Sequence, residues 1–256
     1  MDARTRVVAI ASVSFAPGFR APLAELGSLC RERGVLLVVD GAQSEGILQT
    51  DVAAMQIDAL ATSSQKGLLA LYGGGFLYVR RAVAETLSPS YLSRAGVAVD
   101  SAHEASTGDT EGFRLAPSAR RFDVGNHNFL AAIALEQSLN DLAALESAHV
   151  EAHCVGLARR LADSLRELGL PILGDPVAEP TQIVAVGRAL SDDHDTSDDA
   201  ALNALYDYLT ANNVRLTIRR GILRFSFHAY NAVEDVERVT DLARTWLGRE
   251  GANPFA

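Results

Sequence analysis

Lys66 is the only lysine of the chain and stands in the segment SSQKG, whereas the other 22 of the 23 Lys and Arg residues are arginines. Arginine serves surface charge equally well, but its guanidinium cannot be deprotonated in a protein and cannot act as an amine nucleophile. A lysine amine can, because its pKa shifts on burial and it forms imines with carbonyl groups. Lys66 is therefore a candidate for covalent chemistry, the alternative being one surface lysine left by composition bias.

Strand-like apolar runs precede the residues that could do chemistry. Residues 6–13 and 35–40 are continuous apolar runs separated by an amphipathic helical pattern. Strand, helix and strand without alternation predict an α/β fold with a parallel sheet covered on both faces. Such sheets place their chemistry at the carboxyl ends of the strands. Asp40 ends the second run, and Lys66 follows a third run at residues 57–64.

A carboxylate and an amine are thus expected at the same edge of the sheet. One explanation is a structural ion pair, since buried charges are normally paired. The other is pyridoxal phosphate, which needs a lysine amine for its imine and a carboxylate to keep its pyridine nitrogen protonated. Residues 62–65 add hydroxyl and amide donors suited to its phosphate.

The second half of the chain has a different pattern. Residues 91–120 show little periodicity and predict a long surface or active-site segment. Long helical patterns follow, and then short strands alternate with helices. We therefore expect two domains, with residues 1–145 forming part of a large α/β domain and its connecting helix, and residues 146–256 a small α+β domain.

The segment VLLVVDGAQSEGILQTDVAAMQIDALATSSQKGLLALYGGGFLYVRR, together with RRFDVGNHN and LRFSFHAYNAVEDVER, resembles the class V aminotransferase family. This group of fold-type I pyridoxal phosphate enzymes includes cysteine desulfurases and isopenicillin N epimerase-like proteins. The resemblance runs through most of the chain. It implies the partial, mostly parallel sheet of the fold-type I large domain, a pyridoxal 5'-phosphate cofactor, an amino-acid substrate and a homodimer.

The resemblance also implies roles for single residues. Lys66 takes the Schiff-base role and Asp40 the role of pyridinium partner. Gln43 matches the residue that bonds the phenolic oxygen or the imine of the cofactor, and Ser63 matches a phosphate contact. Arg224 matches the arginine that clamps the α-carboxylate of the substrate, a task suited to a planar bidentate fork.

The sequence departs from the family pattern in three places. Gln65 stands where the family usually has histidine, and Asn126 stands where a threonine often reaches the phosphate of the neighbouring subunit. Relatives also carry a stretch before the equivalent of Val7 that supplies a phosphate loop and a stacking ring. We therefore expect a truncated chain or one piece of a split enzyme, with weak cofactor binding unless a complementing chain fills the gap.

The cysteines bear on the choice of reaction. A cysteine desulfurase needs a nucleophilic cysteine on a mobile loop, whereas Cys30 and Cys154 both fall in helical patterns typical of the core. The expectation is an aminotransferase, epimerase or lyase in which Lys66 serves as general acid and base, and not a cysteine desulfurase. The alternative is a non-catalytic remnant, or one subunit of a split enzyme, that dimerises or binds a partner without turnover.

Composition excludes several other classes. A net charge of −9 and a pI near 5.1 argue against nucleic acid or a membrane surface as partner. No apolar run reaches the length of a membrane span, and two helical cysteines fit a cytoplasmic protein. Residues 191–199 lack the glycine and glutamate of a calcium loop, and the histidines show no metal spacing, so no metal site is expected.

Overall fold

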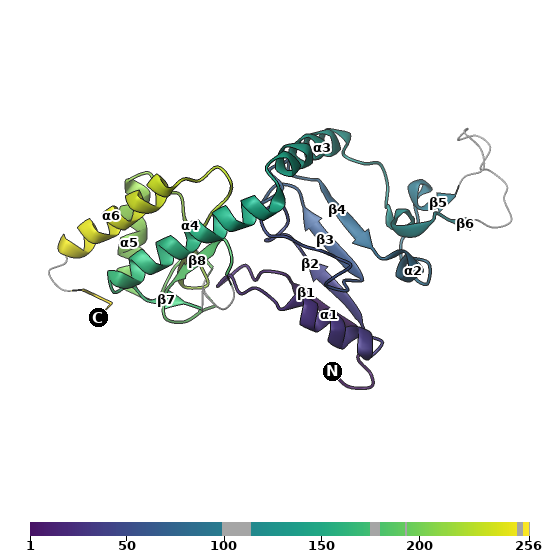
Figure 1. The fold of residues 1–256 in the computed structure, drawn as a ribbon, viewed down its shortest axis with the longest axis horizontal. Helices are drawn as coiled ribbons and strands as arrows, with labels where there is room; N and C mark the ends of the chain where they lie inside the picture. The colour runs from purple at the N-terminus through teal and green to yellow at the C-terminus, as the bar shows by residue number, and fades with distance from the viewer. Residues whose placement is uncertain (99–113, 175–179, 193, 250–252, 256) are drawn as a thin grey trace. The chain divides into compact units, whose positions relative to one another are not determined.

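The computed structural model describes residues 1–98, 114–174, 180–192, 194–249 and 253–255 and divides into two compact units (Figure 1). Each unit is built from three stretches of chain and is described by itself. The first unit comprises Met1–Ala11, Pro22–Ala42 and Thr50–Asn140. The second comprises Ser12–Ala21, Gln43–Gln49 and Asp141–Ala256.

A four-stranded sheet in the order β1-β2-β3-β4 forms the centre of the first unit. The first three strands are parallel and the fourth is antiparallel to β3. Their bounds are β1 Val7–Ala11, β2 Leu36–Asp40, β3 Ala59–Ser63 and β4 Gly75–Val79. The predicted α/β class with a mostly parallel sheet is confirmed.

Helix α1 (Leu23–Glu32) connects β1 to β2. Its buried residues are Leu23, Gly27 and Cys30, and Cys30 is 1% exposed. Gly27 lets the helix pass close to the following connection, because a Cβ there would lie 2.0 Å from the Met55 carbonyl oxygen. The parallel β1-β2 pair is therefore joined by a tightly packed crossover helix, as parallel strands require.

The remaining elements of the first unit follow β4. They are α2 (Arg81–Ala84), a 3-10 turn at Arg94–Gly96, β5 (Val97–Ala98), β6 (Arg114–Leu115), a second 3-10 turn at Ser118–Phe122 and α3 (Phe129–Ala144). Strands β5 and β6 pair antiparallel. Of the segment predicted as irregular at 91–120, residues 99–113 lie outside the described residues.

Asp58, in the turn before β3, joins three parts of the sheet. Its Oδ2 accepts a hydrogen bond from the Leu37 N–H of β2 at 2.9 Å. Its Oδ1 accepts from Arg80 Nε at 2.8 Å, directly after β4, and Arg80 Nη2 lies 2.7 Å away. The Asp58 side chain is only 5% exposed, so this ion pair is largely shielded from solvent.

The second unit is an α+β structure around an antiparallel sheet in the order β7-β8-β10-β9. The strands are β7 Ile172–Leu173, β8 Ile183–Val186, β9 Thr217–Arg219 and β10 Ile222–Ser226. The helices are α4 Ser147–Glu167, α5 Ala200–Ala211 and α6 Val233–Arg249. The largest cluster of buried side chains packs between this sheet and these helices.

Glu151 of α4 holds the two short N-terminal stretches of the second unit. It accepts from Arg20 Nη1 at 2.8 Å and from the Gln49 N–H at 2.7 Å. Burial acts to raise the pKa of Glu151, but the Gln49 N–H and Arg20 outweigh it and lower that pKa overall. The contact therefore stabilises the unit at pH values above the ordinary glutamate pKa. This stabilisation is lost as the pH falls through the lowered pKa of Glu151 in the folded state.

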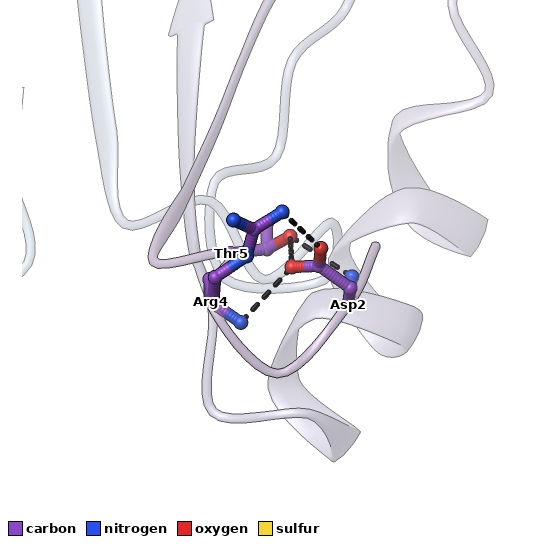
Figure 2. Close-up of polar contacts among 3 residues, drawn as sticks. All are labelled: Asp2, Arg4 and Thr5. Carbon is purple, nitrogen blue, oxygen red and sulfur yellow. Dashed lines mark hydrogen bonds and ion pairs between the residues drawn. The ribbon is translucent and has the colours of Figure 1, made fainter.

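The N-terminal turn shown in Figure 2 is a local surface feature. The Asp2 carboxylate accepts from the Arg4 N–H at 2.9 Å and from Arg4 Nη2 at 3.2 Å, and Thr5 Oγ1 completes the turn. These side chains are exposed, and exposed pairs contribute little to stability. In the part of the chain that the structure describes, no helix combines the length and the hydropathy of a membrane span.

Asp58→Ala is expected to destabilise the protein by about 3 kcal/mol, since it leaves the Arg80 guanidinium and the Leu37 N–H without their partner. The control is Asp51→Ala, which removes an exposed carboxylate that accepts only from the Ala53 and Ala54 N–H groups. This control is expected to cost about 1 kcal/mol. Urea unfolding measures both, and equal losses would contradict the role assigned to Asp58.

Candidate functional site

Lys66 lies on a turn that begins directly after β3. The turn is fixed by main-chain hydrogen bonds, with the Leu69 N–H on the Lys66 carbonyl at 2.9 Å and the Ala70 N–H on the Ser64 carbonyl at 2.8 Å. The Ser64 N–H in turn donates to the Gly74 carbonyl at 3.0 Å. Lys66 itself is exposed. The amine is thus carried by a rigid support but remains accessible.

Two hydroxyl groups brace the same turn. Ser64 is completely buried, and its Oγ donates to the Leu71 carbonyl at 2.5 Å. Ser138 of α3, which is also buried, donates to the Leu68 carbonyl. Of the hydroxyl donors that precede Lys66 in the sequence, Ser64 is therefore occupied in holding the turn, whereas Ser63 is half-buried at the end of β3.

Glycines at the start of β4 allow close packing behind the turn. A Cβ on Gly74 would lie 2.8 Å from Ser64 Oγ and 2.9 Å from the Ala131 Cβ. A Cβ on Gly75 would lie 2.2 Å from the Thr62 carbonyl oxygen. The run of three glycines, which lacks the spacing of a dinucleotide-binding motif, therefore serves the packing of the Lys66 turn.

Asp40 stands at the carboxyl end of β2, the strand next to β3. It is opposite Ala61 in the parallel register, and the Gly41 N–H donates to the Ala61 carbonyl at 2.8 Å. Asp40 Oδ1 accepts from the Ala42 N–H at 2.9 Å, which fixes the carboxylate on its own turn. Because the carboxyl ends of parallel strands meet at one edge, Asp40 and the Ser63-to-Lys66 segment share an edge of the sheet.

Asn126 lies in the loop before α3. It lines a hollow of about 580 Å³ whose other polar walls include Arg94, Arg120 and His127. Gln65, in contrast, is half-buried in the Lys66 turn. Five predicted cofactor residues therefore lie in the first unit. Four of them lie at the sheet edge, namely Asp40, Ser63, Gln65 and Lys66, and the fifth, Asn126, lies in the loop before α3.

Arg224 and Gln43 belong to the second unit and contact one another. Arg224 Nη2 donates to Gln43 Oε1 at 3.2 Å, and the guanidinium carbon lies 6.0 Å from the centroid of the Phe15 ring. Among the described residues, no carboxylate lies within ion-pair distance of Arg224, and its buried Nε has no hydrogen-bond partner. Burial and the positive charge of Arg219 lower the pKa of Arg224 to about 10.

This environment would suit an anion. A half-buried guanidinium normally pairs with a carboxylate, and an unsatisfied buried donor is rare in native structures. At neutral pH Arg224 remains charged despite its lowered pKa, since the pKa of about 10 is still well above 7. The geometry therefore suits a carboxylate supplied by a ligand.

The donors of the first unit fit pyridoxal phosphate. They comprise one accessible amine on a braced turn, one carboxylate at the neighbouring strand end, and hydroxyl and amide groups between them. These are the groups that the cofactor needs for its imine, its pyridine nitrogen and its phosphate. In the described residues, no group of three or more His, Cys, Asp or Glu side chains could hold a metal ion.

Comparison with known proteins identifies the family. The family model described as aminotransferase class-V matches residues 1–239. The chain belongs to the aminotransferase class-V family. The resemblance carried by the three sequence segments is thereby confirmed.

Curated relatives of the chain carry different names. The chain is 34% identical to a protein of Pseudomonas aeruginosa named "Probable cysteine desulfurase", over 92% of this chain and 57% of the relative. It is 28% identical to the isopenicillin N epimerase of Streptomyces clavuligerus, over 94% of this chain and 60% of that protein. The chain thus spans about 57–60% of the length of these relatives.

Solved structures confirm the fold-type I assignment of the fold. An apo cysteine desulfurase from Thermococcus onnurineus superposes with a TM-score of 0.79 at 24% identity, covering 95% of this chain and 60% of the other. A cystine C–S lyase, solved with its product cysteine persulfide, superposes with a TM-score of 0.77 at 21% identity. This match covers 95% of this chain and 62% of the lyase chain. A mutant of that lyase has glycine covalently linked to pyridoxal phosphate, so the cofactor prediction is confirmed at the level of the family.

The exclusion of cysteine desulfurases on sequence grounds is wrong, because relatives and structural neighbours carry that name. Cys30 and Cys154 are indeed buried, at 1% and 0% exposure, and burial raises the pKa of Cys154 to about 11. Buried thiols of this kind are poor nucleophiles. The burial of these two cysteines bears only on which thiol could accept sulfur, and it does not exclude the relationship to cysteine desulfurases.

Two residues near Arg224 were missed by sequence reasoning. Phe15 follows an apolar run, and no motif marks it as a neighbour of Arg224. Gln182 precedes β8, is 2% exposed, and donates from Nε2 to the Gln43 carbonyl at 2.5 Å. A lone glutamine at the start of an apolar strand was the one available signal.

Gly74→Ala is expected to destabilise the protein by about 2 kcal/mol and to loosen the Lys66 turn, because the new methyl group overpacks against Ser64 and Ala131. Gly156→Ala in α4 is the control, since a Cβ there meets nothing within 4 Å. It is expected to stabilise the helix by about 0.5–1 kcal/mol. Thermal unfolding measures both changes, and an unchanged Gly74→Ala variant would contradict the packing described for the turn.

Proposed function

We propose that the protein is a pyridoxal phosphate-dependent enzyme that acts on an amino acid through Lys66. The observation that carries the proposal is the placement of the only lysine. Its amine is accessible on a braced turn, at the sheet edge that also presents Asp40. A lysine retained only for surface charge would need neither the buried Ser64 nor the close approach of Gly74.

Bound at this edge, the cofactor supplies an electron sink that stabilises negative charge at the substrate α-carbon. Lys66 would hold the cofactor through its Nζ. Once the lysine amine is released from the cofactor, it would accept a proton from the substrate α-carbon and return it. Asp40 keeps a proton on the pyridine nitrogen by charge pairing. Ser63 and Gln65 donate to the phosphate, and Asn126 serves the phosphate of a neighbouring copy.

Arg224 binds the substrate carboxylate in this proposal. Its guanidinium lacks a carboxylate partner among the described residues and is oriented by Gln43. A planar fork recognises carboxylates in two-point contacts, which fixes the direction of the α-carbon substituents. Gln43 also remains the proposed contact for the phenolic oxygen or the imine.

The relatives favour a sulfur-containing amino acid as the substrate, with cleavage of its carbon–sulfur bond. The names "Probable cysteine desulfurase" and cystine C–S lyase motivate this choice. Cys30 and Cys154 are both buried, so the sulfur would pass to a thiol outside these two residues. Transamination and epimerisation share the same early steps and are distinguished by product analysis.

We further propose that the protein works as a homodimer or with a complementing chain, in the cytoplasm. Helix α3 exposes Phe129, Leu130 and Ile133, at 70%, 68% and 65% exposure. Contiguous exposed apolar side chains of this size are typical of interaction surfaces. The division into a cofactor domain at 1–145 and a small domain at 146–256 is retained as part of this proposal.

The test is an absorbance titration of the chain with pyridoxal phosphate. The wild type is expected to develop the long-wavelength band of a lysine imine. Lys66→Ala is expected to lose this band while retaining its far-ultraviolet circular dichroism. Lys66→Arg keeps the charge and is the matched control. A band of equal size in either variant, or no band in the folded wild type, would contradict the proposal.

A further inference from the structure

The unsatisfied buried polar atoms of the described residues converge on Gln43. Two buried side-chain atoms lack a hydrogen-bond partner, and they are Gln182 Oε1 and Arg224 Nε. Each of these side chains donates from a different atom, a nitrogen, to Gln43. Gln182 Nε2 donates to the Gln43 main-chain oxygen at 2.5 Å, and Arg224 Nη2 donates to the Gln43 side-chain oxygen at 3.2 Å.

Gln182 is held in place by its burial and by its main-chain pairing at the end of β10. It is 2% exposed, and its carbonyl accepts from the Phe227 N–H at 3.0 Å, which continues the pairing of β8 with β10. The neighbouring Thr181 Oγ1 donates to the Gly18 carbonyl at 3.1 Å. Thr181 therefore ties down the stretch 12–21, whereas Gln182 ties down the stretch 43–49.

A glutamine is a costly choice for this position. Its side-chain oxygen has no hydrogen-bond partner in a buried setting, where an apolar side chain of similar length would carry no such penalty. The single bond that it makes fixes the main chain of the residue whose amide contacts Arg224. Residues that orient a binding group are themselves held by packing and hydrogen bonds, as Gln182 is.

We infer that Gln182 is a positioning residue for the binding of the substrate carboxylate, a role that rests on the proposed function of Arg224. By holding the Gln43 carbonyl, Gln182 fixes the direction of the Gln43 side chain. Gln43 Oε1 then fixes the plane of the guanidinium, with Phe15 at 6.0 Å from its carbon. The guanidinium is thus oriented before the carboxylate arrives, which lowers the entropic cost of binding.

The experiment titrates the full chain, without cofactor, with 3-mercaptopropionate, a carboxylate that has no amine. Two-dimensional ¹H–¹⁵N spectra report the Arg224 Nε–H and the Gln43 side-chain amide, assigned through Arg224→Lys and Gln43→Ala. In ligand-free Gln182→Met both signals are expected to shift. The dissociation constant is expected to rise about fivefold to tenfold, the value of one positioned hydrogen bond.

Thr181→Val is the matched control. It removes a buried hydroxyl at the adjacent position that bonds Gly18 and not Gln43. It is expected to lower the melting temperature, but to change the dissociation constant by less than about twofold. Gln182→Glu, which replaces the donating nitrogen by an oxygen facing the Gln43 carbonyl, supplies a second variant and is expected to bind more weakly than Gln182→Met.

A double-mutant cycle completes the test. Gln43→Ala removes the hydrogen bond between Gln43 and Arg224, so the effects of Gln43→Ala and Gln182→Met on affinity are expected to be non-additive. Additive effects, unshifted ligand-free signals in Gln182→Met, or an equal loss in Thr181→Val would overturn the positioning role alone. If the wild-type Arg224 Nε–H does not respond to the ligand, the proposed carboxylate role of Arg224 fails, and the inference falls with it.

Discussion

The buried carboxylate of Asp58 is the contact on which the arrangement of the first unit depends. One oxygen receives the main-chain N–H of Leu37 in β2, and the other receives the guanidinium of Arg80 after β4. A charge at 5% exposure requires both partners, because an uncompensated buried charge is strongly unfavourable. This contact links the turn before β3 to β2 and to the residue that follows β4. Those strands in turn deliver Asp40 and the Lys66 turn to one edge of the sheet.

The same principle explains the difference between Asp58 and Arg224. Asp58 is a buried charge that the chain itself neutralises. Arg224 is a half-buried charge that no carboxylate of the described residues neutralises, and its Nε is left without an acceptor. The first arrangement stabilises the fold, whereas the second leaves a buried donor unsatisfied, which supports the carboxylate-binding role proposed for Arg224. Within the second unit, Arg224 bonds the Gln43 side chain and Gln182 bonds the Gln43 main chain.

Much of this could be predicted from the sequence. The continuous apolar runs predicted β1, β2 and β3, and the helical patterns of the second half predicted the long helices found there. Lys66 stood out because a single amine among arginines is a chemical signal. The packing contacts could not be predicted in this way. The roles of Asp58, Ser138 and Gln182 depend on partners that are distant in the sequence, at separations that no local pattern encodes.

The mistaken exclusion of cysteine desulfurases has a similar origin. Both cysteines were correctly placed in helical cores, but their burial describes where sulfur cannot be accepted and not which bond is cleaved. Function depends on the site as a whole and not on one residue type. The glycines before β4 show the same limit, since their spacing excluded a nucleotide motif, whereas their use in packing the Lys66 turn appeared only in the structure.

The claim that Lys66 carries the cofactor is tested most directly by borohydride reduction in the presence of pyridoxal phosphate, followed by peptide mass mapping. The chain contains two kinds of primary amine, the Lys66 side chain and the N-terminus. The prediction is stoichiometric labelling of the peptide containing Lys66, with little labelling of the N-terminus. Labelling confined to the N-terminal amine, or equal labelling of both in folded protein, would contradict it.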